Sequence, residues 1–116
     1  MTNVQIIKNK GIIKGFVVSG HSGYSEAGSD IVCSAISSLS QSVCVGLENV
    51  LKLKPIIKID EQKAYLSCML ENNISEEMLE KSQVLLKTFE ESVKLLLLGD
   101  KKLKKYINLE VKNEIY

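Results

Sequence analysis

The chain is poor in the residues that form metal centres and disulfide frameworks. Its 116 residues include one histidine and three widely spaced cysteines. An odd number of cysteines without a Cys-x-x-Cys pair fits neither a disulfide framework nor a common zinc cluster. We therefore expect reduced thiols, no metal and no other cofactor.

Surplus charge and targeting signals are also missing. The 15 basic residues nearly balance the 14 acidic ones, so the charge gives no reason to expect a nucleic acid as a required partner. The first residues lack the basic start and apolar run of a signal peptide, and no apolar stretch approaches the roughly 20 residues that span a bilayer. We expect a cytoplasmic protein with no membrane partner, built as one domain over residues 1–116.

Hydrophobic periodicity predicts two strand pairs, two helices and a closing strand. The first strand pair reverses at Lys8-Asn9-Lys10-Gly11, because Asn and Gly suit a tight turn. Strands are expected at about 4–6, 12–18, 55–59, 64–70 and 106–111, and helices at about 31–53 and 76–99. The order ββαββαβ predicts a two-layer α+β fold, in which two helices cover a mixed sheet of about five strands.

Three residues are predicted to cap these helices. Asp30 suits the N-cap of the first helix, which would make Cys33 the third helical residue. Ser75 suits the N-cap of the second helix, and Gly99 suits a left-handed C-cap at its end.

The only histidine and one cysteine lie at the two ends of a glycine-rich loop. His21 follows the second predicted strand, and Cys33 lies in the first turn of the predicted helix. Unpaired N–H groups and the helix dipole at that turn would favour a thiolate and could hold the oxyanion of an acyl-transfer intermediate. If the loop folds back, His21 can take the thiol proton. This pattern predicts a cysteine nucleophile with a histidine base.

Each of these residues also has a simpler interpretation. His21 could be an ordinary loop residue, Cys33 a small buried apolar group, and Asp30 a cap alone. Ser37, one turn after Cys33, either faces the site or bonds to its own helix backbone. Gln41 continues the stripe of Ser37 toward the site or a partner.

The remaining cysteines and glycines have structural interpretations. Cys44 lies roughly on the stripe of Ser37, but we assign both Cys44 and Cys68 to packing, because neither has a histidine or a second cysteine at useful spacing. Glycines in the loop suit turns. Residues 22–29 offer little to bury, which predicts a mobile loop in the absence of substrate.

The Gly20-His21 dipeptide, Gly28, the Asp30-Ile31-Val32-Cys33 segment and Ser37 resemble the Prp family of ribosomal-processing cysteine proteases. The resemblance implies a homodimeric endopeptidase that removes the N-terminal extension of the twenty-seventh protein of the large ribosomal subunit, a step in ribosome assembly. It implies a catalytic dyad of His21 and Cys33, with Asp30 and Ser37 in support. By the same resemblance, the substrate loop contains Gly20, Ser22, Gly23 and Gly28. Ser22 and Ser34 stand where alanine is commoner in the family.

Two other functions remain open. A noncatalytic ribosome-assembly module could hold its partner through the sheet edge and the lysine-rich residues 101–105. A redox-sensing protein could oxidise Cys33 to a sulfenic acid, although no obvious resolving cysteine lies beside it in the sequence.

Overall fold

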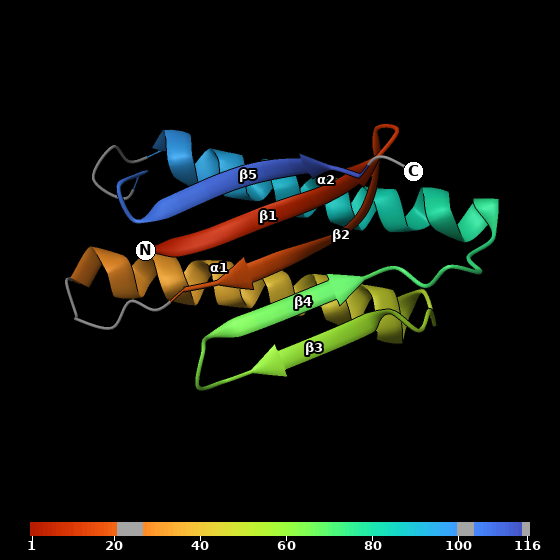
Figure 1. The fold of residues 1–116 in the computed structure, drawn as a ribbon, viewed down its shortest axis with the longest axis horizontal. Coiled ribbons are helices and arrows are strands. Elements are labelled where there is room, and N and C mark those ends of the chain that lie inside the picture. The colour runs from red at the N-terminus through yellow and green to blue at the C-terminus, as the bar shows by residue number, and fades with distance from the viewer. Residues whose placement is uncertain (21–26, 100–103, 115–116) are drawn as a thin grey trace.

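The computed structural model describes residues 1–20, 27–99 and 104–114, with the backbone alone for residues 27–30. The elements follow the predicted order ββαββαβ (Figure 1). They are β1 (Thr2–Asn9), β2 (Ile12–Ser19), α1 (Ala27–Val45) with the π-helical segment η1 (Gly46–Val50), β3 (Ile56–Asp60), β4 (Tyr65–Met69), α2 (Glu76–Gly99) and β5 (Ile107–Asn113).

The strands form one mixed sheet in the order β3-β4-β2-β1-β5. β5 runs parallel to β1, and the other neighbouring strands pair antiparallel. Both helices lie on the same face of this sheet (Figure 1). The predicted two-layer α+β fold is confirmed.

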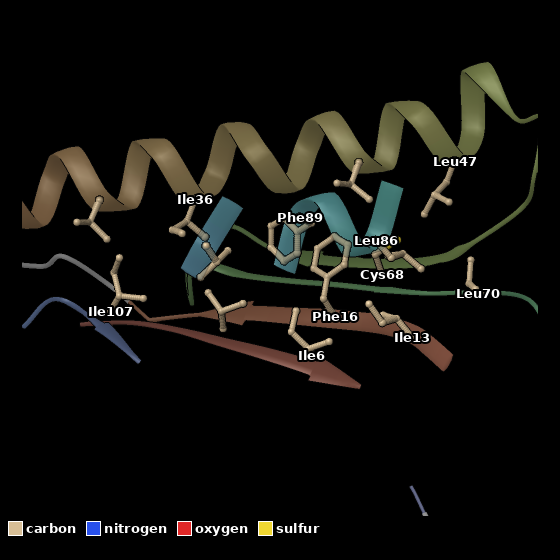
Figure 2. Close-up of a cluster of buried hydrophobic side chains, with 14 residues drawn as sticks. Ile6, Ile13, Phe16, Ile36, Leu47, Cys68, Leu70, Leu86, Phe89 and Ile107 are labelled. Atoms are coloured by element: carbon tan, nitrogen blue, oxygen red, sulfur yellow. The ribbon is translucent and has the colours of Figure 1, made fainter. Parts of the chain in front are cut away.

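The core lies between the sheet and the two helices (Figure 2). Phe16 of β2 and Phe89 of α2 meet at its centre, with ring centroids 4.4 Å apart. Such an aromatic pair stabilises a fold by about 0.5–1.5 kcal/mol beyond the area it buries. Ile36 of α1 is also fully buried, so the sheet and both helices contribute to one core.

The first hairpin turns where the sequence predicts. β1 and β2 are joined by Lys10 and Gly11, whose φ angles are 51° and 81°. Two successive residues with positive φ are typical of the type I′ turn that matches the twist of a hairpin. Glycine at the second of these positions adopts such a φ without a steric penalty.

The start of α1 differs from the prediction. The helix begins at Ala27, so Asp30 is its fourth residue and not its N-cap, and Cys33 is the seventh residue and not the third. Alanine is the strongest helix former, and an acidic residue is favourable anywhere in the first turn as well as at the cap. An aspartate at position 30 therefore fits the N-cap and the first turn equally well, and does not by itself show where the helix begins. Residues 27–29, which the prediction placed in a mobile loop, belong to this helix.

The other helix ends agree in part with the prediction. Ser75 caps α2 as expected, because the Met78 N–H donates to Ser75 Oγ at 3.3 Å. α2 ends at Gly99, but this glycine has no positive φ, so the predicted left-handed cap is wrong. The first helix ends with η1 at Val50, before the predicted Leu53, and Lys52 then turns the chain with a φ of 59°.

The expectation that no apolar stretch approaches the length of a membrane span is wrong for one stretch of α1 and η1. Ile31–Val50 is long and apolar enough to cross a membrane, with a mean hydropathy of 1.4. Its apolar stripe packs in the core, where Val32, Ile36 and Leu47 are fully buried. Several serines lie on its outer side, including the exposed Ser34, Ser38 and Ser42. We therefore interpret this stretch as the core helix of the domain.

Candidate active site

Cys33 lines a cavity of about 330 Å³ between α1 and the ends of the four strands β1 to β4. One wall is the side of α1 that carries Cys33, Ser37 and Gln41, and the other is the turn of the β3–β4 hairpin together with the end of β2. We call this cavity the Cys33 groove. Its lining residues are Thr2, Val18, Gly20, Cys33, Ser37, Ser40, Gln41, Ile59, Asp60, Glu61, Ala64, Tyr65 and Leu66.

The hairpin wall is shaped by the carboxylate at the end of β3. Asp60 Oδ1 accepts hydrogen bonds from the Gln62 N–H at 3.1 Å and the Lys63 N–H at 3.3 Å. Ala64 closes the turn with a φ of 48° and donates its N–H to the Glu61 carbonyl at 3.2 Å. A short aspartate side chain bonded to the following N–H groups is a common way to fix a turn.

Glycine is required at position 20, where β2 enters the groove. Gly20 has a φ of 108°, and a Cβ atom there would lie 2.2 Å from the Met1 carbonyl oxygen. A side chain would force the two backbone segments apart. Gly20 therefore permits the close approach that places the end of β2 beside the N-terminus.

The α1 wall presents three polar side chains on successive turns. Cys33 is half-buried, and Ser37 and Gln41 follow it by four and eight residues on exposed positions. The Gln41 Nε2 donates to Ser37 Oγ at 3.2 Å. Ser40 also lines the groove, but its buried hydroxyl donates to the carbonyls of Ile36 and Ser37 at 2.7 and 3.1 Å. The groove thus brings together Cys33, Ser37 and Gln41, which the helical spacing predicted to lie on one stripe of α1. Gly20, from the end of β2, also lines it.

The other predicted site residues are only partly described. His21, Ser22 and Gly23 lie outside the described residues, so the pairing of His21 with Cys33 stays a prediction. Gly28 and Asp30 belong to the first turn of α1, where the backbone alone is described.

The position of Cys33 in α1 changes its predicted chemistry. In the α-helix, the Cys33 N–H is paired with the carbonyl of residue 29, because each N–H bonds four residues back. Only the first four N–H groups of a helix lack such partners, and the dipole acts mainly within the first turn. The N–H of Cys33 is therefore not available to an oxyanion, and Cys33 lies beyond the first turn, where the helix dipole was expected to favour its thiolate.

Cys44 and Cys68 form a thiol pair that sequence reasoning missed. Both pack in the core, Cys68 with no exposed surface and Cys44 half-buried. A hydrogen bond from the Cys68 thiol lowers the pKa of Cys44, against the opposing effects of burial and of Glu48. The same hydrogen bond, together with burial, raises the pKa of Cys68. Cys44 therefore turns toward β4 and does not continue the Ser37 stripe into the groove.

Sequence reasoning also missed the hairpin wall. The groove that Cys33 lines is also lined by Asp60, Glu61 and Tyr65, which reach it because β4 pairs with β2. No local motif marks these three residues. Among the side chains that the structure describes, in residues 1–20, 31–99 and 104–114, no group of three His, Cys, Asp or Glu could hold a metal ion. Of the lysine-rich residues 101–105, the structure describes Lys104 and Lys105, and the Lys105 ammonium lies 5.0 Å from the Tyr106 ring centroid.

Solved structures share this architecture. SMU.848 from Streptococcus mutans matches with a TM-score of 0.81 and 25% identity, over 98% of this chain and 96% of that one. An essential ribosomal processing protease, Prp from S. aureus, solved in complex with a substrate peptide, matches with a TM-score of 0.81 and 21% identity, over 97% and 100%. The same S. aureus protease with a covalently linked product peptide matches with a TM-score of 0.77 and 22% identity, over 97% and 100%.

Sequence comparison identifies the family. A search among curated proteins finds no significant match. The family model described as cysteine protease Prp matches residues 1–108, which is nearly the whole chain. With its fold and a cysteine placed in an open groove, the chain belongs to the Prp family of cysteine proteases.

Proposed function

We propose that this protein is a ribosomal-processing endopeptidase that removes the N-terminal extension of the twenty-seventh protein of the large ribosomal subunit. The observation that carries the proposal is the position of Cys33, on the wall of a groove of about 330 Å³. Membership of a cysteine protease family supports it. The S. aureus protease of the same fold, solved with its substrate peptide, supports the choice of a ribosomal substrate.

The proposed chemistry is acyl transfer through a thioester. His21 takes the thiol proton of Cys33, and the thiolate attacks the scissile carbonyl carbon. The tetrahedral intermediate collapses as His21 returns that proton to the leaving amine, which departs as the new N-terminus of the mature protein. A water molecule, deprotonated by His21, then hydrolyses the thioester, releases the extension as a carboxylate and restores the thiol.

Incubation with the full-length precursor tests the activity itself. The protein is mixed with the ribosomal precursor of its own host, and the N-terminus of the product is sequenced. We expect one new N-terminus with the wild-type protein and none with Cys33→Ala. Ser34→Ala is the matched control, because Ser34 is the exposed neighbour of Cys33 and does not line the groove. Native-rate processing by Cys33→Ala would rule out the mechanism.

The role of His21 needs a separate measurement. The alkylation rate of Cys33 is followed between about pH 5 and pH 9 in the wild-type protein and in His21→Ala. A base that forms an ion pair with the thiol keeps the thiolate populated at lower pH, so the variant should need a higher pH for the same rate. Identical pH profiles would show that His21 is not the base.

We also propose that the active protein is a cytoplasmic homodimer, as the family resemblance implies. The chain has a mass of 12.9 kDa, so light scattering should give about twice that value. A single-chain mass at working concentration, with full processing activity, would contradict this assembly.

A further inference from the structure

The Ser37–Gln41 pair on α1 has no evident role in holding the fold. Both side chains are exposed, and their 3.2 Å hydrogen bond joins two residues four positions apart on one helix. Such a pair stabilises a helix by only about 0.2–0.5 kcal/mol. Both residues nevertheless line the Cys33 groove.

The Gln41 amide keeps hydrogen-bonding capacity for a ligand. A carboxamide has two N–H donors and an oxygen with two lone pairs. Within the described residues, Gln41 uses one donor, and Ser37 Oγ accepts it. Ser37 thereby orients the amide, which retains an N–H and its oxygen.

The same protein shows how a glutamine amide binds a peptide backbone. Gln83 accepts from the Ile13 N–H at 2.9 Å and donates to the Ile13 carbonyl at 2.8 Å. This pairing satisfies both polar groups of one residue in an extended strand. An extended substrate in the Cys33 groove would present the same two groups to Gln41.

We propose that Gln41, oriented by Ser37, is a substrate-binding residue that pairs with the main chain of the bound peptide. Gln41 follows Cys33 by eight residues, which is about 12 Å along the helix. An extended peptide advances about 3.3 Å per residue. The subsite therefore lies three to four residues from the scissile bond. Cleavage then requires a substrate that reaches at least that far on one side of the cut.

This inference rests on the proposed function, so its test is made in binding as well as in turnover. A fluorescent peptide that covers about six residues on each side of the cut spans the subsite in either direction. Its Kd is measured against the Cys33→Ala protein with Gln41 and with Gln41→Ala. Peptides shortened from each end in turn show which side reaches Gln41.

The long peptide should bind about 3- to 10-fold more weakly to Gln41→Ala, as expected for one or two neutral hydrogen bonds. Peptides cut back to two residues on the side that reaches Gln41 should bind the two proteins equally. In the active protein, the loss should appear in KM, with little change in kcat. Ser37→Ala should give a smaller loss, because it removes the orientation and leaves the amide. Ser42→Ala is the control, since Ser42 is exposed on α1 and does not line the groove.

Several outcomes would overturn the subsite. One is an equal Kd for both proteins with the long peptide, another is an equal loss for long and short peptides, and a third is no binding of the peptide at all. Failure of the proposed function looks different, because the wild-type protein would then bind the peptide without cutting it.

Discussion

Gln83 on α2 pairs its side-chain amide with both backbone groups of Ile13 on β2. The two hydrogen bonds measure 2.9 and 2.8 Å. β4 pairs with β2 only from Gly15 to Val18, so Ile13 lies beyond the end of that ladder. A helix side chain therefore satisfies the strand where the neighbouring strand stops.

Replacing Gln83 with alanine should destabilise the protein. The part-buried N–H and carbonyl of Ile13 would lose their partners, which should lower the free energy of unfolding by about 1–3 kcal/mol. Urea denaturation measures this change. Gln62→Ala, at an exposed turn position, should stay within about 0.5 kcal/mol of the wild type. Equal effects of the two substitutions would contradict the role of Gln83.

Glu90 of α2 is a buried acid that is paired with Lys8. Lys8 Nζ lies 3.2 Å from Glu90 Oε2, and the Glu90 side chain is only 5% exposed. Lys8→Ala should lower the free energy of unfolding by about 1–3 kcal/mol, because it leaves a buried carboxylate poorly compensated. Lys94 also approaches Glu90, at 3.9 Å, but its side chain is 44% exposed. Thermal unfolding should therefore show a loss below about 1 kcal/mol for Lys94→Ala, and the opposite order would refute this assignment.

The thiol pair of Cys44 and Cys68 predicts a pH-dependent reactivity. The pKa of Cys44 is lowered because the Cys68 thiol donates a hydrogen bond to its sulfur. In a Cys33→Ala background, Cys68→Ala should shift the alkylation of Cys44 to higher pH, since the thiolate loses its donor. Cys68→Ser keeps an O–H donor and should shift it less. An unchanged profile in Cys68→Ala would show that the hydrogen bond does not set the pKa.

The elements of the fold could be predicted because their signals are local. The Lys10-Gly11 turn, the Ser75 cap and the apolar stripe of α2 each depend on residues close together in the sequence. The start of α1 could not be fixed in the same way. Asp30 is equally suitable as a cap and as a first-turn acid, and the choice between them depends on how the chain leaves β2.

The candidate site was predictable on α1 and not on the opposite wall. Helical periodicity alone aligns Cys33, Ser37 and Gln41 on one side. Asp60 and Glu61 reach the groove through the register of β4 on β2, and the contact between Cys44 and Cys68 depends on how α1 packs on the sheet. Such contacts between distant segments are properties of tertiary packing, which no local pattern specifies.

Trapping the acyl-enzyme tests most directly whether Cys33 is the nucleophile. The protein is mixed with the precursor peptide, quenched with acid while turnover proceeds, and mapped by mass spectrometry. We predict that the fragment containing Cys33 gains the mass of the extension less one water, as a thioester, and that Cys33→Ala gives neither this adduct nor cleavage. Cleavage without any adduct on Cys33, or with the adduct on Cys44, would contradict the mechanism.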